Sequence, residues 1–371
     1  MRRTMTLTNH WWLLIWLLIC RVLFHNFPKR YERLDGRIVK RWAFLPTIIM
    51  VVPYIIWAGY RKNFIDTGSY RSALWGLPYD ISDIPSLFNG DKKDPGFTVL
   101  LIFLKKLIGN QDVQMFLIIA TFQMLCVALV YRKYSSDVWT SLLLFVISTD
   151  YMSWVQNGMR QFIACCMIFA CFKWLLNKRY IPLIIVILLA STIHGSALLM
   201  IPIIFVVQGE AWNIKTILMM AATAVMIAYI DQFTPLMNDL LQNTQYDDVM
   251  SNEIWTTDDG TNLIRVLVYS VPAIVSLVGL KIIRAENNPV INICVNCSIV
   301  TMALYLVAAV TSGIYIGRLP IYTTLMGYIS LPWLIDRIFV KRSAAVVRVM
   351  MMTMYVLFFY YQMFIGWRLH G

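Results

Sequence analysis

The sequence predicts an all-α, polytopic integral membrane protein. Hydrophobic residues make up 59% of the 371 residues and charged residues only 14%, and the mean hydropathy is +0.65. Soluble domains use roughly 45–50% apolar and 25% charged residues. The apolar runs are continuous rather than alternating, which argues against a transmembrane barrel. Because a helix satisfies its own backbone hydrogen bonds inside lipid, we expect these runs to be helices.

The apolar runs predict about twelve membrane spans, because a spanning helix needs about 20 mostly apolar residues. The predicted spans are residues 8–24, 42–59, 112–131, 138–154, 160–177, 180–193, 195–208, 212–230, 263–283, 290–312, 319–336 and 345–366. The first is expected to be a retained helix rather than a signal peptide, since no small residues mark a cleavage point after it. The stretch 180–208 is expected to be a hairpin or one bent span, broken at His194 and Gly195.

Lys and Arg gather in every second connection, so we expect those connections to face the cytoplasm. They hold Lys29, Arg30, Arg33, Arg37, Lys40, Arg41, Arg132, Lys133, Lys178, Arg179, Lys215, Lys281, Arg284, Arg337, Lys341 and Arg342. Two long loops are expected to face outward: residues 60–111, before the third helix, and residues 231–262, between the eighth and ninth. The second loop is acidic and has no Lys or Arg. Arg2 and Arg3 are the exception, since this orientation places them outside.

Residues 1–371 are expected to form a single membrane domain, with interfacial helices in the two outward loops. Residues 97–108 are apolar but too short to span, and they contain Lys105 and Lys106 near their end. This combination favours an interfacial or re-entrant segment.

Several kinds of chemistry are not indicated. The net charge of +12 comes mostly from short loops beside helices, which is a signal of topology rather than of nucleic-acid binding. The seven cysteines lie in apolar runs, and Cys294 and Cys297 have no second pair, which favours helix packing over a metal or redox site. The acid pairs at 247–248 and 258–259 lack a third ligand for a divalent ion. The sequence therefore predicts no metal site. It also contains no nucleotide or dinucleotide motif, so no cofactor is predicted. An enzyme of this kind would need a substrate that is already activated.

Polar residues at the predicted outer ends of the helices form the candidate site. An arginine at the centre of a membrane helix costs roughly 2.5–3.5 kcal/mol, so it needs a partner, a watery cavity or an interface. The planar fork of arginine donates two parallel hydrogen bonds to phosphate and stays charged when desolvated. The outward cluster therefore suggests an anionic lipid headgroup or a pyrophosphate as ligand. Its members are Arg61, Asp66, Tyr70, Arg71, Asp94, Arg160, Gln161, His194, Arg265 and Arg318.

Structural roles stay open for these residues. Arg160 could extend to lipid headgroups, His194 could form a hydrogen bond between helices, and Arg318 could be an ordinary interfacial charge. Asp66 and Asp94 share their loop with other aspartates, where solvation is the simpler role.

Five motifs follow one another along most of the chain. They are Arg61-x4-Asp66-x3-Tyr70, Asp94-Pro95-Gly96-Phe97, Arg160-Gln161-x2-Ala164, His194-x-Ser196-Ala197-Leu198, and Arg318-x3-Tyr322 ahead of Pro332. In this order and spacing the chain resembles the EpsG-like, Wzy-type polysaccharide repeat-unit polymerases. The pair formed by the third and fourth motifs is the most specific part of the resemblance.

The resemblance implies a bacterial inner-membrane glycosyltransferase whose active site faces the periplasm. Members of the family polymerise oligosaccharide units carried on undecaprenyl pyrophosphate, as in O-antigen, capsule or exopolysaccharide biosynthesis, without nucleotide or other cofactor. The implied partners are this lipid-linked oligosaccharide, membrane lipid and a chain-length regulator protein, with no nucleic acid. The candidate proton acceptors are His194, Asp66 and Asp94, and the candidate residues for binding pyrophosphate or glycan are Arg160, Gln161, Arg318, Arg61, Tyr70, Arg265 and Tyr322.

Two other functions fit parts of the sequence. A flippase or transporter for a lipid-linked glycan also needs outward arginines, but its polar groups are expected through the midplane of the membrane. A membrane O-acyltransferase that modifies the glycan would take its acyl donor from the cytoplasmic side, so its polar groups are expected near that face.

Topology reporter fusions after residues 94, 160, 194 and 250 test the predicted orientation. We expect a periplasmic reporter such as alkaline phosphatase to be active at all four positions, because each lies in or beside an outward connection. A cytoplasmic reporter active at these positions would overturn the orientation and favour the acyltransferase.

Overall fold

The computed structural model describes residues 7–24, 30–34, 37–62, 64–77, 87, 94–230 and 260–367. The chain divides into two compact units, residues 1–198 with 346–371 and residues 199–345. The predicted single membrane domain stays a prediction.

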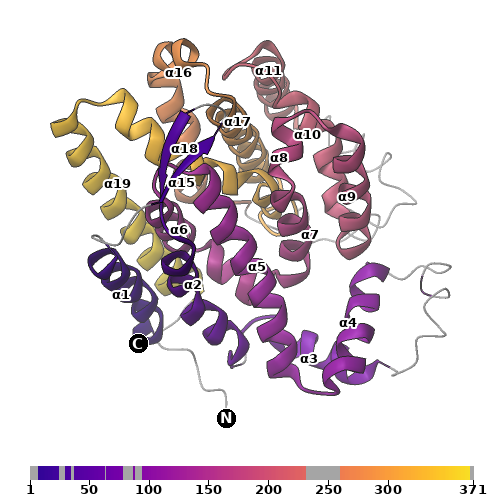
Figure 1. The fold of residues 1–371 in the computed structure, drawn as a ribbon. Coiled ribbons are helices and arrows are strands. Elements are labelled where there is room, and N and C mark those ends of the chain that lie inside the picture. The colour runs from indigo at the N-terminus through magenta and orange to yellow at the C-terminus, as the bar shows by residue number, and fades with distance from the viewer. Residues whose placement is uncertain are drawn as a thin grey trace. The chain divides into compact units, whose positions relative to one another are not determined.

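The first unit is helical apart from one β-hairpin (Figure 1). Its elements are α1 (Leu7–Leu23), β1 (Arg30–Leu34), β2 (Arg37–Arg41), α2 (Phe44–Gly59), α3 (Thr67–Gly76), α4 (Pro95–Ile108), α5 (Asp112–Tyr134), α6 (Val138–Ile147), the π-helix Tyr151–Asn157, α7 (Met159–Ala170), α8 (Phe172–Leu176), α9 (Tyr180–Ile193) and the start of the 3-10 turn Gly195–Leu199. From residue 346 it also holds most of α19 (Lys341–Tyr361) and the π-helix Gln362–Gly366.

The second unit contains the helices that follow. They are α10 (Met200–Val206), α11 (Ile214–Ala228), α15 (Leu263–Val278), α16 (Leu280–Glu286), α17 (Pro289–Val310), the 3-10 turn Ile316–Arg318 and α18 (Ile321–Ile338). Asparagines begin three of these helices: the side chains of Asn213, Asn262 and Asn288 accept hydrogen bonds from backbone N–H groups of the first turn, which otherwise lack partners. The buried core joins α15, α16, α17 and α18 around Ala273, Val295 and Leu334.

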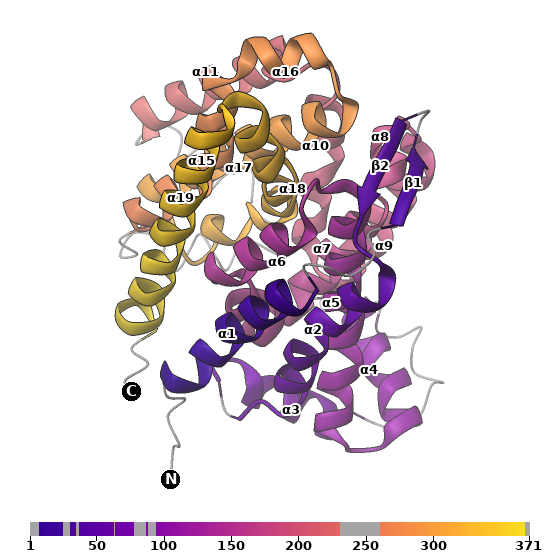
Figure 2. The same cartoon turned by 60° about the vertical axis from the view of Figure 1, so that its left-hand side comes forward.

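The helices of the first unit bring loop residues together at two separate ends. At one end, Arg132 Nε donates to the Trp42 carbonyl oxygen at 2.9 Å, joining the end of α5 to the start of α2. At the other, Trp75 Nε1 donates to the Asn110 carbonyl oxygen at 3.2 Å, joining α3 to the loop before α5. Figures 1 and 2 show the β-hairpin at the first end and α3 and α4 at the second. The unit therefore separates the predicted cytoplasmic loops from the loop at 60–111.

The predicted helical class is confirmed, whereas the count of about twelve spans stays a prediction. Among the described residues, the helices Asp112–Tyr134, Pro289–Val310 and Lys341–Gly366 are long and apolar enough to cross a membrane. Two bent pairs bring the number to 5 if each is one span, and further apolar helices have 10–17 residues.

The structure interrupts some predicted elements and adds others. The segments predicted as continuous spans at 138–154 and 263–283 are bent by 75° and 70°. A hairpin pairs Arg30 with Arg41 and Leu34 with Arg37 where a basic loop was predicted. Within 60–111 the structure forms α3 and α4, and α4 matches the short apolar segment predicted at 97–108. Most of the acidic loop predicted at residues 231–262 lies outside the described residues.

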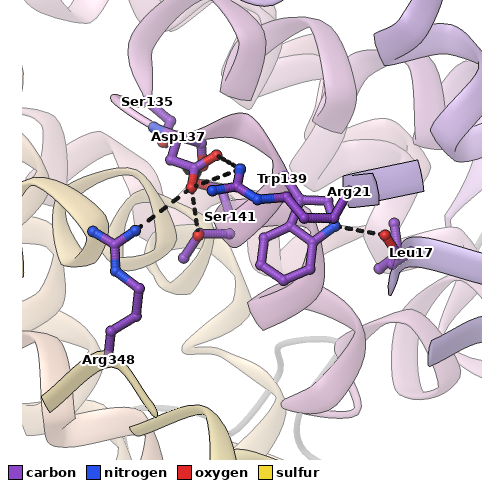
Figure 3. Close-up of polar contacts among 8 residues, drawn as sticks. Leu17, Arg21, Ser135, Asp137, Trp139, Ser141 and Arg348 are labelled. Atoms are coloured by element: carbon purple, nitrogen blue, oxygen red, sulfur yellow. Dashed lines mark hydrogen bonds and ion pairs between the residues drawn. The ribbon is translucent and has the colours of Figure 1, made fainter. Parts of the chain in front are cut away.

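A charged cluster joins three helices of the first unit at the hairpin end (Figure 3). Asp137, just before α6, lies between Arg21 of α1 at 3.3 Å and Arg348 of α19 at 3.9 Å. Its carboxylate also accepts from Thr140 Oγ1 at 2.8 Å. The Arg21 guanidinium lies 5.0 Å from the ring centroid of Trp139. One carboxylate thus neutralises part of the charge of two arginines and holds α1 and α19 to α6.

The variant Asp137→Ala is expected to lower the free energy of unfolding by about 1–3 kcal/mol, because two arginines and a hydroxyl lose their common acceptor. The effect is expected in the lower part of that range since Arg21 is 35% exposed. Equilibrium unfolding of the detergent-purified protein measures it, with Lys173→Ala, an exposed lysine of α8, as the control. Equal stability of Asp137→Ala and the wild type would contradict the role of this cluster.

Candidate functional site

Arg160 lies at the start of α7 and forms an ion pair with Asp94 at the start of α4. The distance from Arg160 Nη1 to Asp94 Oδ2 is 3.0 Å, and the side chains are 40% and 10% exposed. The guanidinium also lies 5.8 Å from the ring centroid of Phe97. Its Nε is buried and has no acceptor among the described residues. The exposed part of the arginine side chain is therefore open to another acceptor, whereas its Nε is not.

Asp94 connects this ion pair to a third segment. Its other oxygen, Oδ1, accepts the backbone N–H of Gly195 at 3.2 Å. Asp94 has φ +57 and precedes Pro95, which is the first residue of α4. Proline is well suited to that position because its fixed φ matches the helix and its missing N–H would have had no partner there. The side chain of Asp94 thus joins the starts of α4 and α7 to the residue just after His194.

Close packing keeps α4 against α9 at this point. A Cβ on Gly96 would lie 2.1 Å from Thr192 Oγ1 and 2.9 Å from the backbone carbon of Thr192. Contacts shorter than 3.0 Å are essentially absent from real structures, so only glycine permits this approach. The DPGF motif therefore supplies the acid, the helix start and the close contact in consecutive residues.

His194 ends α9 in an extended conformation, with φ −155 and ψ 115. Its backbone N–H donates to the Ala190 carbonyl oxygen at 3.0 Å, and its Nδ1 shares a hydrogen bond of 2.7 Å with Ser196 Oγ. The predicted break in the 180–208 stretch is thus confirmed: α9 stops at Ile193, and a 3-10 turn begins at Gly195. The break places His194 directly beside the residue that binds Asp94.

Tyr70 and Asp66 approach the same helix start from α3. The Tyr70 hydroxyl accepts the backbone N–H of Arg160 at a long 3.5 Å, and its ring meets Phe97 edge-on at 6.0 Å. Burial raises the pKa of Tyr70 above its ordinary value, so the phenol is neutral at physiological pH. The backbone N–H of Asp66 donates to Asn157 Oδ1 at 3.3 Å, and its side chain is half-buried.

Arg61 is buried against the π-helix rather than placed on the ion pair. It is 2% exposed, and its Nη1 donates to the carbonyl oxygens of Val155 at 2.9 Å and Gln156 at 2.7 Å. Its guanidinium lies 3.9 Å from the ring centroid of Phe116. Burial lowers the pKa of Arg61 to about 10, which leaves it charged at neutral pH. In this structure Arg61 satisfies carbonyl groups at the end of the π-helix.

The remaining predicted residues divide between the two units. Gln161 is 3% exposed and lies beside Arg160 in the first unit. Arg265, Arg318 and Tyr322 belong to the second unit, in α15, in the 3-10 turn Ile316–Arg318 and in α18. Arg318 is exposed, Arg265 is half-buried and Tyr322 is 2% exposed. In that unit, the Thr261 N–H donates to the Ala308 carbonyl oxygen at 2.8 Å, joining the segment before α15 to the end of α17.

The described residues contain no group of three or more His, Cys, Asp or Glu that could hold a metal ion. Cys294 and Cys297 are buried free thiols on α17. The acid pairs at 247–248 and 258–259 lie outside the described residues.

The chain matches one protein-family model over most of its length. Residues 44–367 match the model of the EpsG family. The chain belongs to the EpsG family. No curated protein and no solved structure matches it. Together with its apolar helices, membership of the EpsG family indicates a membrane protein of polysaccharide biosynthesis.

Several residues that complete the site of this EpsG-family chain were missed from sequence. Asn157, Thr192 and the Gly195 N–H carry no signal by residue type, since their roles depend on which helix ends meet. Asp150 does carry one: it is an ionisable residue inside the predicted span 138–154, and such residues are rare and usually functional in membranes.

The contact between Gly96 and Thr192 can be tested with alanine. Gly96→Ala is expected to lower the free energy of unfolding by about 1–3 kcal/mol, because the new methyl group collides with the backbone of α9. Gly68→Ala is the matched control, since a Cβ there meets nothing within 4 Å and alanine favours a helix. Thermal unfolding of both purified variants measures the difference. Equal melting temperatures would contradict the close approach of α4 to α9.

Proposed function

We propose that this chain is a glycosyltransferase that polymerises oligosaccharide repeat units linked to undecaprenyl pyrophosphate. It acts at the periplasmic face of the bacterial inner membrane, in the biosynthesis of O-antigen, capsule or exopolysaccharide. The observation that carries the proposal is the ion pair of Arg160 and Asp94, which is bound to the residue after His194. The cluster lies at the starts of α4 and α7. Figure 2 shows α4 and the β-hairpin at different ends of their unit, which supports the predicted outward orientation.

Arg160 is proposed to bind the pyrophosphate of the lipid-linked chain. Its side chain is 40% exposed beside the ion pair with Asp94. Binding of arginine to phosphate gives short, charge-assisted hydrogen bonds. These bonds become stronger as negative charge develops on the leaving group, so they lower the barrier to reaction. Asp94 holds the guanidinium in place before the substrate arrives.

His194 is the preferred general base. In the tautomer whose Nδ1–H donates to Ser196 Oγ, Nε2 is the ring nitrogen that would accept the proton. The acceptor-sugar hydroxyl oxygen then bonds to C1 of the growing chain, and the bond from C1 to the pyrophosphate oxygen breaks. The hydroxyl proton passes to His194, while the bond electrons leave with undecaprenyl pyrophosphate. Asp66 and Asp94 are the alternative bases.

Further residues are proposed to complete substrate binding. The proposed substrate-binding residues are Gln161 and Tyr70 in the first unit, and Arg265, Arg318 and Tyr322 in the second unit, each placed only within its own unit. Arg61 is proposed to act on the ligand only indirectly, since its Nη1 donates to two carbonyl groups. No cofactor is required, because the pyrophosphate bond supplies the activation. A chain-length regulator is the proposed protein partner.

Glycan ladders from complemented cells test the site. Arg160→Lys and His194→Ala are expected to shorten or abolish the ladder at normal protein levels, since lysine lacks the planar fork and removing a general base typically costs 10²–10⁴-fold in rate. Arg179→Lys is the matched control, because Arg179 is exposed and lies just before α9, away from the ion pair. Full-length ladders from both site variants would refute the proposal.

Deletion in the native host separates the proposed activity from a flippase. A polymerase mutant is expected to carry a single repeat unit on its lipid core or carrier, because export continues without polymerisation. Complete loss of surface glycan would favour the flippase instead.

A further inference from the structure

The span predicted at 138–154 is broken around a buried carboxylate. Asp150 is 0% exposed, and it lies between α6 and the π-helix Tyr151–Asn157, which are bent by 75°. The preceding Thr149 has φ +72, a conformation that is strained for a β-branched residue and costs about 1–3 kcal/mol. The π-helix is itself rare and frequently occurs at functional sites. An apolar residue at 150 would avoid the separate cost of burying a carboxylate, so the acid needs a reason.

Asp150 forms hydrogen bonds with residues on both sides of it in the sequence, and one of them is Trp154 of the π-helix. Its Oδ2 accepts from Ser148 Oγ at 3.2 Å, and its Oδ1 accepts the indole N–H of Trp154 at 3.1 Å. A buried carboxylate is tolerable only when such hydrogen bonds compensate its lost hydration. The bond to Trp154 also orients the indole, since the indole N–H is the only donor of that side chain.

The oriented indole packs against Gly158. A Cβ on Gly158 would lie 2.7 Å from Trp154 Cε3, so the backbone passes directly over the ring. The Gly158 N–H donates to the Ser153 carbonyl oxygen at 2.8 Å, which closes the last turn of the π-helix. Arg160 follows two residues later, in the first turn of α7. The direction in which α7 leaves this turn decides whether Arg160 reaches Asp94.

We infer that Asp150 is a positioning residue: its hydrogen bond to Trp154 sets the indole against Gly158, and this contact aims Arg160 at Asp94 and the substrate. The inference rests on the proposed function for its consequence in catalysis, although the positioning itself is a property of the structure. Asp150 is 0% exposed, so it acts on Arg160 indirectly, through Trp154 and Gly158.

Cross-linking tests the positioning without any assay of activity. The Asp66 N–H donates to Asn157 Oδ1, so cysteines at positions 66 and 157 can be joined by a short bifunctional methanethiosulfonate and detected as a linked peptide by mass spectrometry. In the full-length protein, Asp150→Ala is expected to slow this reaction about tenfold, which is the order expected from losing a hydrogen bond to a charged group. The parent is the protein with only the substitutions Asp66→Cys and Asn157→Cys. Asp150→Asn keeps an oxygen acceptor for Trp154, so its cross-linking should be nearly as fast as that of the parent.

A matched control separates positioning from general destabilisation. Asp137→Ala removes another charged partner at the start of α6, on the far side of the bend, and should leave the cross-linking rate unchanged in folded protein. A parent rate in Asp150→Ala, or an equal loss in Asp137→Ala, would overturn the inference.

A double-mutant cycle tests the step through the indole. Gly158→Ala should slow cross-linking much more in the parent than in the Trp154→Leu background, because the ring 2.7 Å from the new Cβ is gone and only the Ser153 carbonyl oxygen, at 3.2 Å, stays close to it. Additive effects would exclude this route. Glycan ladders of the Asp150 variants then connect positioning to activity. A normal ladder from Arg160→Ala would refute the proposed function. The cross-linking rates would still decide whether Asp150 positions this segment.

Discussion

Every charged side chain that enters the helical interior of this protein must find a partner there. The ion pair of Arg160 and Asp94 meets this requirement at the site, and the organisation of the first unit depends on it. Since Asp94 also binds the Gly195 N–H, a single carboxylate fixes three helix ends. Without it, Arg160 would lose its charged partner, and α4 would lose its polar link to the end of α9.

The same requirement explains buried charges elsewhere in the first unit. Lys105 is 2% exposed, and its Nζ donates to the carbonyl oxygens of Leu74 at 3.0 Å and Trp75 at 2.9 Å, at the end of α3. Arg61 does the same for the last residues of the π-helix. Carbonyl groups at helix ends have no partner within the helix. Lys105 and Arg61 therefore each stabilise the end of a helix.

A site built from helix ends has a functional advantage. Under the proposed function, backbone groups and short loops at these ends would approach the lipid-linked substrate, while the helices behind them hold the geometry. The cost is local strain, which appears at Asp94 and Thr149 as positive φ values. Strain of this kind persists only where the surrounding packing over-determines it. Here the packing comes from Tyr70, Phe97 and Met159, which share one buried cluster.

The sequence by itself determined the helical membrane class, the interruption at His194 and the separation of basic from polar connections, because these follow from local hydrophobicity and charge. It also singled out Arg160, Asp94 and His194 by residue type and motif. Only the tertiary structure decided that Asp94 pairs with Arg160, that Arg61 turns to the π-helix, and that Asp150 breaks a predicted span. These choices depend on which distant helix ends meet, and a hydrogen bond between residues 94 and 160 leaves no trace in the local pattern around either one.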